Sequence, residues 1–147
     1  MNTTLTPNLM SESVNESVAF YCRNLGFRFL AGMKTVGDNL DARVDEFARE
    51  VPLQWAMLGR DDARVMFQSR LSLARECEAM TALPLGVSGA LYLEVADLDS
   101  LLTELGGEVQ TVLADHTTFY GMREIWVRDN NGYILVLAQS DNPVREA

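Results

Sequence analysis

An internal duplication limits the folds that this chain can adopt. In residues 91–105, alternating apolar side chains predict a strand, Asp97 is typical of a helix N-cap, and leucines at helical spacing predict the helix that follows. Residues 5–25 repeat this plan, and aligning Leu9 with Leu93 also places a serine of the earlier cap region on Asp97. The chain is therefore expected to contain two copies of one strand–helix unit.

Further strands are predicted after each helix. Gly26 follows the first helix, and Gly106-Gly107 is expected to supply the left-handed residue that ends the second. Hairpin turns are predicted at 59–62 and 129–132, where Gly, Asn and Asp tolerate positive φ. Each half therefore reads strand, helix, strand, strand, strand. The added strands are predicted at 27–33, 53–58 and 65–69 in the first half and at 109–113, 123–128 and 133–139 in the second.

Two segments fall outside the repeat. Residues 37–51 are acidic and carry Val44, Phe47 and Ala48 at helical spacing, which predicts a short helix or a lid. Residues 71–88 join the two halves and end in a Pro- and Gly-containing stretch. Either these segments gate a binding cleft, or they are plain surface connectors, since loops lengthen at small entropic cost.

The composition narrows the class of protein. At 147 residues the chain has the length of one domain, and 48% apolar with 22% charged residues is typical of a globular protein. The net charge of -9 repels phosphates, which argues against binding to nucleic acid or to anionic lipid. The sequence has neither a basic start nor a long apolar run, so we expect no signal peptide, no membrane span and a cytoplasmic location.

The cysteines and the single histidine form no catalytic or metal-binding motif. Cys22 and Cys77 are far apart, without Cys-x-x-Cys spacing, and are expected to be reduced and mostly buried thiols. His116 is the only histidine and is predicted to lie in a loop at 115–118. Because no nucleophile elbow or Gly-rich phosphate loop accompanies it, no catalytic residue is predicted.

Three strings of residues carry a resemblance to a known family. They are Ser-Val-Ala-Phe-Tyr at 17–21 with Asn-Leu-Gly-Phe at 24–27, Tyr-Leu-Glu-Val-Ala-Asp-Leu-Asp at 92–99, and Tyr-Gly-Met-Arg-Glu at 120–124 with Val-Arg-Asp-Asn-Asn-Gly at 127–132. In this order, and laid over the duplication, they resemble the glyoxalase/bleomycin-resistance/dioxygenase family, also called vicinal oxygen chelate. The resemblance covers nearly the whole chain.

The resemblance implies an α+β fold in a single domain. Two βαβββ modules would follow one another and form curved mixed sheets around a cavity, with module one at about 1–70, a linker at about 71–88 and module two at about 89–140. The family usually completes such a cavity by homodimerisation. Pro7 lies inside the first predicted strand, where proline is tolerated only at an edge or a bulge, and this fits a module boundary or a strand exchanged between subunits.

The resemblance also implies where a divalent metal would bind. Enzymes of the family hold the metal with His, Gln and Glu side chains, and their positions fall on Thr6, Ala90 and Val136, none of which is a normal metal ligand. The turn at 129–132 and the residue after it also differ from the usual sequence of the family, with Asn130 where proline is usual and Tyr133 where asparagine is usual. The chain is therefore most similar to the metal-free bleomycin-resistance branch, and no cofactor is expected.

Alternation along the strands predicts which side chains line the cavity. Where the apolar residues of a strand face the helices, the residues between them face the opposite side of the sheet. An alternative is that the Trp and Met side chains are plain core and that the glutamates pair with Arg23, Arg123 or Arg128. The predicted ligand-binding residues are Trp55, Met57, Met66 and Gln68 in the first half and Tyr92, Glu94, Glu124 and Trp126 in the second.

Two functions are compatible with this pattern. Tryptophan faces and carboxylates in an apolar cleft suit a planar or cationic guest, so the favoured hypothesis is a protein that sequesters an aromatic or cationic compound, such as a bleomycin-type antibiotic, in a dimer cleft. The alternative is a metal-dependent lyase, isomerase or ring-cleaving dioxygenase of the same family, with Glu94, Glu124 and His116 as unconventional ligands.

Overall fold

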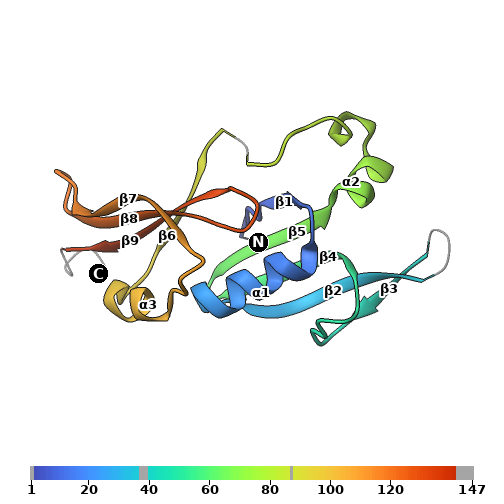
Figure 1. Cartoon of the computed structure of the whole chain (residues 1–147), viewed down its shortest axis with the longest axis horizontal. Coiled ribbons are helices and arrows are strands. Elements are labelled where there is room, and N and C mark those ends of the chain that lie inside the picture. Colours follow the sequence, from blue (N-terminus) through green and yellow to red (C-terminus); the bar gives the residue numbers. More distant parts are fainter. Residues whose placement is uncertain (1, 37–39, 87, 142–147) are drawn as a thin grey trace.

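Two mixed sheets, of five and four strands, form the framework of the molecule (Figure 1). The computed structural model describes residues 2–36, 40–86 and 88–141. The elements in chain order are β1 (Asn8–Ser11), α1 (Val14–Leu25), β2 (Arg28–Val36), β3 (Leu40–Val44), β4 (Leu53–Arg60), β5 (Ala63–Ser69), α2 (Arg70–Glu76), the 3-10 turn η1 (Glu78–Met80), β6 (Ala90–Glu94), α3 (Leu98–Glu104), β7 (Gln110–Thr117), β8 (Met122–Arg128) and β9 (Ile134–Ser140).

The strand order repeats between the sheets. The first sheet runs β1-β5-β4-β2-β3 and the second runs β6-β9-β8-β7, with β1 parallel to β5, β6 parallel to β9 and every other neighbour antiparallel. Apart from β3, each sheet therefore orders its strands first, last, third, second. This confirms the predicted fold, a pair of βαβββ modules, with β3 as an added edge strand.

The helix starts confirm the alignment of the two copies. Ser13 and Asp97, which the duplication superposes, are the N-caps of α1 and α3, and their side chains accept hydrogen bonds from the backbone N–H groups of Glu16 and Ser100 at 3.2 and 3.0 Å. Gly26, with φ of 69°, ends α1 as predicted. The two helices are therefore built by the same local signal.

The end of α3 differs from the prediction. Leu105, with φ of −65°, is its C-cap, and neither Gly106 nor Gly107 is among the described residues with positive φ. A Cβ at Gly106 would meet the side-chain ends of Glu108 and Asn24. The predicted hairpin turns are confirmed, with positive φ at Asp61 in one and at Gly132 in the other.

The segment predicted as a helix or lid is a strand followed by a loop. Of residues 37–51, those at 37–39 lie outside the described residues, and the next five form β3, which pairs with β2. Phe47 packs its ring on Phe29 of β2, with ring centroids 5.8 Å apart. Two of the apolar residues whose spacing suggested a helix, Val44 and Phe47, thus pack against the core from β3 and the loop after it.

Two smaller expectations, on Pro7 and on Cys77, also change. Strand β1 starts at Asn8, so Pro7 precedes it, and the Pro7 carbonyl accepts a hydrogen bond from the Met66 N–H at 2.8 Å. A proline here forfeits no ladder hydrogen bond. Cys22 is half-buried, and burial raises the pKa of its thiol, but Cys77 is exposed beyond α2, so the expectation of buried thiols is wrong there. Within the described part of the chain, no helix is long and apolar enough to cross a membrane.

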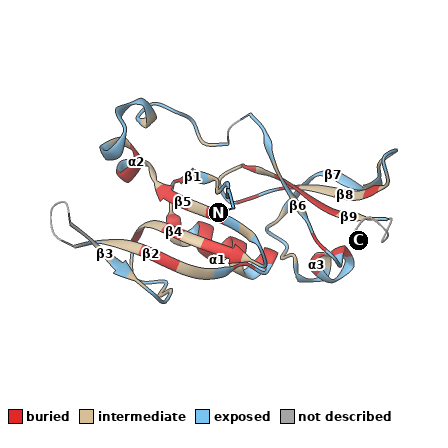
Figure 2. Cartoon of the chain, turned by 180° about the vertical axis from the view of Figure 1, so that it is seen from behind, coloured by how far each residue is buried: buried red, intermediate tan, exposed pale blue. Residues whose placement is uncertain are grey.

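A single core extends through both modules. Figure 2 shows buried residues concentrated on α1 and on the strands that it covers. Val18 and Leu25 of α1 share this cluster with Phe67 of β5, and also with Leu98 of α3 and Leu137 of β9 from the other module. The modules therefore bury apolar surface against each other and share one core.

Polar contacts fasten the β8–β9 turn of module two to module one. The Asn131 amide donates to the hydroxyls of Ser11 and Ser17, at 3.2 and 2.9 Å. The Tyr21 hydroxyl donates to the Asp129 carboxylate at 2.7 Å, and the Tyr133 hydroxyl donates to the carbonyl of Met10 at 2.8 Å. We call this contact, made by residues 129–133 with residues 10–21, the junction.

Asp129 is the charged group of the junction. Burial raises the pKa of its carboxyl above the usual value, and the hydrogen bond from Tyr21 opposes that rise. Backbone N–H groups of Asn131 and Tyr133 also donate to it, at 2.8 and 3.0 Å. The carboxylate thus depends on these donors to remain in a buried position.

Replacement of Tyr21 by Phe should destabilise the protein by about 1.5–3 kcal/mol, the range for a hydrogen bond to a charged group. Urea denaturation monitored by circular dichroism measures this loss as a lower midpoint with an unchanged slope. Tyr133→Phe is the matched control, because its hydroxyl bonds a neutral carbonyl and should cost about 0.5–1.5 kcal/mol. Equal losses in the two variants would contradict the role assigned to Asp129.

Candidate functional site

The side chains predicted to line a cavity lie on the sheet faces opposite the helices. In β4, Ala56 and Leu58 belong to the core, and the intervening Trp55 and Met57 are only partly buried. The same alternation separates Val65 and Phe67 from their neighbours in β5, and Val127 from its neighbours in β8. The predicted residues therefore occupy the two outer sheet faces, as the alternation required.

On the first sheet, the predicted residues form an aromatic and methionine surface. Trp55 is the cross-strand partner of Gln68, and Met57 is the partner of Met66. Met33 of β2 is the cross-strand partner of Trp55 on its other side, so it shares this face, although it is not among the residues predicted from the sequence. We call Met33, Trp55, Met57 and Met66 the methionine face.

Gln68 has a structural role at the edge of this face. It is 4% exposed, and its carbonyl oxygen accepts a hydrogen bond from the Asn8 amide at 2.8 Å. Its own amide nitrogen lies 2.9 Å from the Ser72 hydroxyl and 3.1 Å from the Glu76 carboxylate, both on α2. These contacts engage both ends of the amide and hold α2 against β1 and β5.

On the second sheet, a buried carboxylate accepts hydrogen bonds from three aromatic side chains. Glu124 is 2% exposed. Its Oε2 accepts hydrogen bonds from the hydroxyls of Tyr92 at 2.7 Å and Tyr120 at 2.9 Å, and its Oε1 accepts one from the indole N–H of Trp126 at 3.1 Å. We call Tyr92, Tyr120, Glu124 and Trp126 the carboxylate cluster.

The carboxylate of this cluster remains ionised. Burial by itself would raise the pKa of Glu124, but the hydrogen bonds from the three aromatic donors and the attraction of His116 outweigh it, so the pKa is lowered. Burial and the hydrogen bond to Glu124 raise the pKa of Tyr92, and the nearby charge of Glu94 adds to the rise. The phenol therefore stays protonated and acts as a donor.

His116 lies beside this cluster and not in a loop. Strand β7 continues to Thr117, and His116 is the cross-strand partner of Glu124. Its Nδ1 is 2.7 Å from the carbonyl of Ala114, and its Nε2 is 3.8 Å from Glu124 Oε1. The loop prediction was wrong because polar residues are accommodated on an exposed edge strand, whose pairing the local sequence does not reveal.

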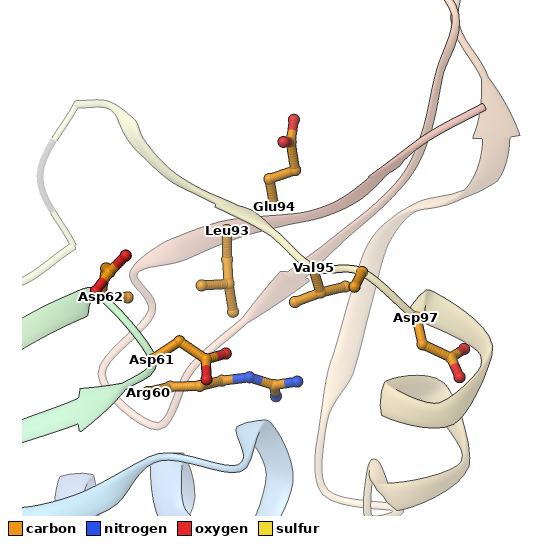
Figure 3. A pocket seen from close by; sticks show the side chains of 9 residues that line it. Arg60, Asp61, Asp62, Leu93, Glu94, Val95 and Asp97 are labelled. Carbon is orange, nitrogen blue, oxygen red and sulfur yellow. The ribbon is translucent and has the colours of Figure 1, made fainter. Parts of the chain in front are cut away.

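Glu94 takes a different position from Glu124. It is exposed at the end of β6, and it points away from Arg60 and Asp61 (Figure 3). The alternative in which the glutamates pair with surface arginines is wrong for Glu124, since it is buried and its hydrogen-bond donors are Tyr92, Tyr120 and Trp126. Arg123 pairs instead with Asp99 and Asp115 at 2.7 and 2.6 Å, and Arg23 pairs with Glu108 at 2.6 Å.

The positions implied for a metal do not fit a metal. Ala90 begins β6 and Val136 is buried in β9, and their hydrocarbon side chains offer no ligand atom. Thr6 precedes β1 and supplies at most a hydroxyl. Among residues 2–36, 40–86 and 88–141, no three His, Cys, Asp or Glu side chains gather closely enough to hold an ion.

A cavity of about 390 Å³ lies where the β4–β5 turn approaches the start of α3 (Figure 3). Its walls include Arg60, Asp61, Leu93 and Asp97. The duplication relates this place to the junction, because turn 59–62 corresponds to turn 129–132. No hydrogen bond between described residues spans the cavity, whereas several close the junction.

The two outer faces remain separate within one chain. No hydrogen bond between described residues links the methionine face to the carboxylate cluster. The strands that carry them lead to opposite ends of the molecule in Figure 1. Large apolar side chains on or beside the second sheet are also exposed: Tyr92, Leu113, Phe119 and Tyr120.

Solved structures with the same fold cover nearly the whole chain. TioX from Micromonospora sp. ML1 has a TM-score of 0.66 at 18% identity, with 95% of this chain and 99% of that chain covered. A glyoxalase/bleomycin resistance protein/dioxygenase family enzyme from Burkholderia phytofirmans PsJN has a TM-score of 0.68 at 13% identity, covering 92% and 96%. A glyoxalase-related enzyme from Fulvimarina pelagi has a TM-score of 0.67 at 17% identity, covering 98% and 91%.

These likenesses show that the chain has the fold of the glyoxalase/bleomycin resistance protein/dioxygenase superfamily. No protein-family model and no curated protein matches the sequence. The resemblance stated from three short strings is therefore confirmed at the level of the fold, while the identities leave the activity to be argued from the site.

Substitution of Tyr92 by Phe should raise the pKa of Glu124, because one of the two hydrogen bonds to Oε2 is lost. Because the pKa of Glu124 is lower in the folded chain than in the unfolded chain, the ionised carboxylate stabilises the fold at pH values above the unfolded-state pKa. This stabilisation is lost as the pH falls through the folded-state pKa. The variant should therefore lose less stability than the parent on acidification.

Side-chain carboxyl NMR titration of Glu124 measures the shift directly. Tyr120→Phe removes the other donor to the same oxygen and should move the pKa in the same direction. Tyr133→Phe, whose hydroxyl bonds the Met10 carbonyl, should leave it unchanged. A Glu124 pKa that is identical in all three variants would refute the arrangement.

Proposed function

We propose that the chain is a metal-free small-molecule binding protein that sequesters an aromatic or cationic compound, of which a bleomycin-type antibiotic is one example. The observation that carries this proposal is the carboxylate cluster, a buried negative charge surrounded by aromatic rings on an open sheet face. The lack of ligand atoms at Ala90 and Val136 supports binding without a metal.

Each outer face supplies a different part of the binding energy. Trp126 and the two tyrosines offer π faces to a cation or a planar group, at about 0.5–2 kcal/mol for each cation–π contact. The methionine face offers Trp55 for stacking and flexible thioethers that adapt to an irregular apolar guest. A compound with both a charged and an apolar part matches the two surfaces together.

We further propose that a second copy of the chain completes the cleft. An open sheet face and an exposed edge strand are both covered when two copies associate with twofold symmetry. In such a homodimer, the methionine face of one subunit would lie opposite the carboxylate cluster of the other and enclose the guest. Sequestration in the cytoplasm would then keep the compound from its target and confer resistance.

Static light scattering should give a mass near twice the 16.4 kDa of one chain. The physical reason is that half-exposed Tyr92, Leu113 and Tyr120 leave apolar surface in water unless a partner covers it. A monomer at micromolar concentration would remove the shared cleft and leave two open faces.

Replacement of Trp126 or Trp55 by Ala should weaken binding by about 1–3 kcal/mol, the cost of losing a stacked aromatic contact. Fluorescence titration with a panel of planar and cationic compounds measures the affinity, and urea unfolding of the same variants measures the stability. A purely structural role would appear instead as a loss of roughly 3–5 kcal/mol in stability.

Two results would overturn the proposed function. One is a panel of planar and cationic compounds that leaves the tryptophan emission unchanged throughout. The other is stoichiometric Fe, Mn, Ni or Zn in protein purified without chelator, since that would favour a metal-dependent lyase, isomerase or dioxygenase.

A further inference from the structure

The charge of Glu124 has no full cationic partner among the described residues. Its direct hydrogen-bond donors are two phenols and an indole, all neutral, and the nearest cationic candidate is His116, at 3.8 Å. Exposed carboxylates of the same chain, Asp99 and Asp115, do pair with an arginine. A buried charge without a counterion is costly, so the carboxylate cluster is arranged to attract a cation from outside.

A ligand cation cannot reach the oxygens of this carboxylate. Oε2 already accepts two hydrogen bonds, and Oε1 accepts the indole hydrogen bond with His116 beside it. A carboxylate has about four acceptor positions, and the side chain is only 3% exposed. The remaining acceptor position is on Oε1, beside His116 and almost wholly covered, so an ammonium group that carries N–H would lose water on entering and gain little from Glu124 in return.

The surface that a ligand can touch is aromatic. Tyr92 is 51% exposed and Tyr120 is 52% exposed, although the hydroxyl of each is held by Glu124. Their exposure therefore belongs largely to the rings. Ring faces attract a cation without requiring it to donate a hydrogen bond, and the carboxylate beneath adds its field.

We propose that the carboxylate cluster selects cations that carry no N–H group, namely quaternary ammonium and N-alkylated aromatic cations, over primary ammonium ions. This inference rests on the proposed binding function and names the class of charge that the site prefers. The selection follows from three occupied acceptor positions on one carboxylate, combined with exposed rings above it.

The test compares three probes that share a benzyl group: benzyltrimethylammonium, benzylammonium and neutral benzyl alcohol. A Trp55→Phe background leaves Trp126 as the only tryptophan, so its emission reports on the carboxylate cluster. Benzyltrimethylammonium should bind about tenfold more tightly than benzylammonium, because both cations meet the ring faces but only benzylammonium gives up N–H hydrogen bonds to water that Glu124 does not replace. Its N-methyl protons should also shift upfield in the NMR spectrum on binding over ring faces.

Tyr92→Phe provides the sharper experiment, because it frees one acceptor position on Glu124 while it keeps the ring. Benzylammonium should gain affinity in this variant, and benzyltrimethylammonium should change little, so the tenfold ratio should shrink. Glu124→Gln should reduce both cations toward the affinity of benzyl alcohol. Tyr133→Phe is the matched control, since it removes a hydroxyl that bonds the Met10 carbonyl in the junction, and it should leave all three affinities unchanged.

The outcomes separate this inference from the proposed function. If planar compounds bind but benzylammonium binds as tightly as benzyltrimethylammonium, the inference alone is overturned. An unchanged ratio in Tyr92→Phe overturns it as well, and this readout does not depend on whether Glu124→Gln folds. If none of the three probes and no planar compound binds, both the inference and the proposed binding function fail.

Discussion

The structure depends on the contact between the β8–β9 turn and helix α1. The buried Asp129 carboxylate accepts a hydrogen bond from the Tyr21 hydroxyl, and the Asn131 amide donates hydrogen bonds to two serines near the start of that helix. The apolar core continues past these polar atoms from one module into the other. Helix α1 packs on the strands of the first sheet and on α3, so its contact with the β8–β9 turn ties module two to module one.

The second sheet also contains a buried, hydrogen-bonded carboxylate, but its pKa shifts in the opposite direction from that of Asp129. At the junction a buried carboxylate is satisfied in order to hold two parts together, and burial still raises the pKa of Asp129. In the carboxylate cluster the donors outweigh burial, so Glu124 keeps its charge. Both carboxylates accept three hydrogen bonds from described residues, so the number of donors does not explain the difference. At Asp129 the effect of burial is the larger one, whereas at Glu124 the attraction of His116 adds to the donors and the pKa is lowered.

Local signals in the sequence were enough to predict most of the fold. Period-two alternation assigned Trp55 and Trp126 to the outer faces. Aligning Leu9 with Leu93 gave the register of the duplication, and the caps Ser13 and Asp97 confirm it. Features that depend on pairing between distant segments were missed. His116 lies in a strand only because β8 pairs with it, and the hairpin formed by β2 and β3 replaces a predicted helix.

The candidate site was predicted as a set of residues but not as an arrangement. Alternation selected Tyr92, Glu124 and Trp126, yet nothing local indicated that all three share one carboxylate, or that Tyr120 completes the group from a turn. Gln68 lies on the expected side of the sheet, but its amide nitrogen is hydrogen-bonded to side chains of α2. Spacing along a strand gives the side of the sheet, whereas hydrogen-bond partners depend on three-dimensional proximity.

The cavity beside Arg60 and Asp61 shows that the two copies of the module have diverged. In module two the β8–β9 turn is hydrogen-bonded to residues at the start of α1. In module one a cavity separates the equivalent β4–β5 turn from the start of α3. A pair of identical chains would repeat any substitution on both sides of their symmetry axis. Two modules within one chain are free of that constraint, so one copy can preserve the contact between turn and helix while the other copy varies.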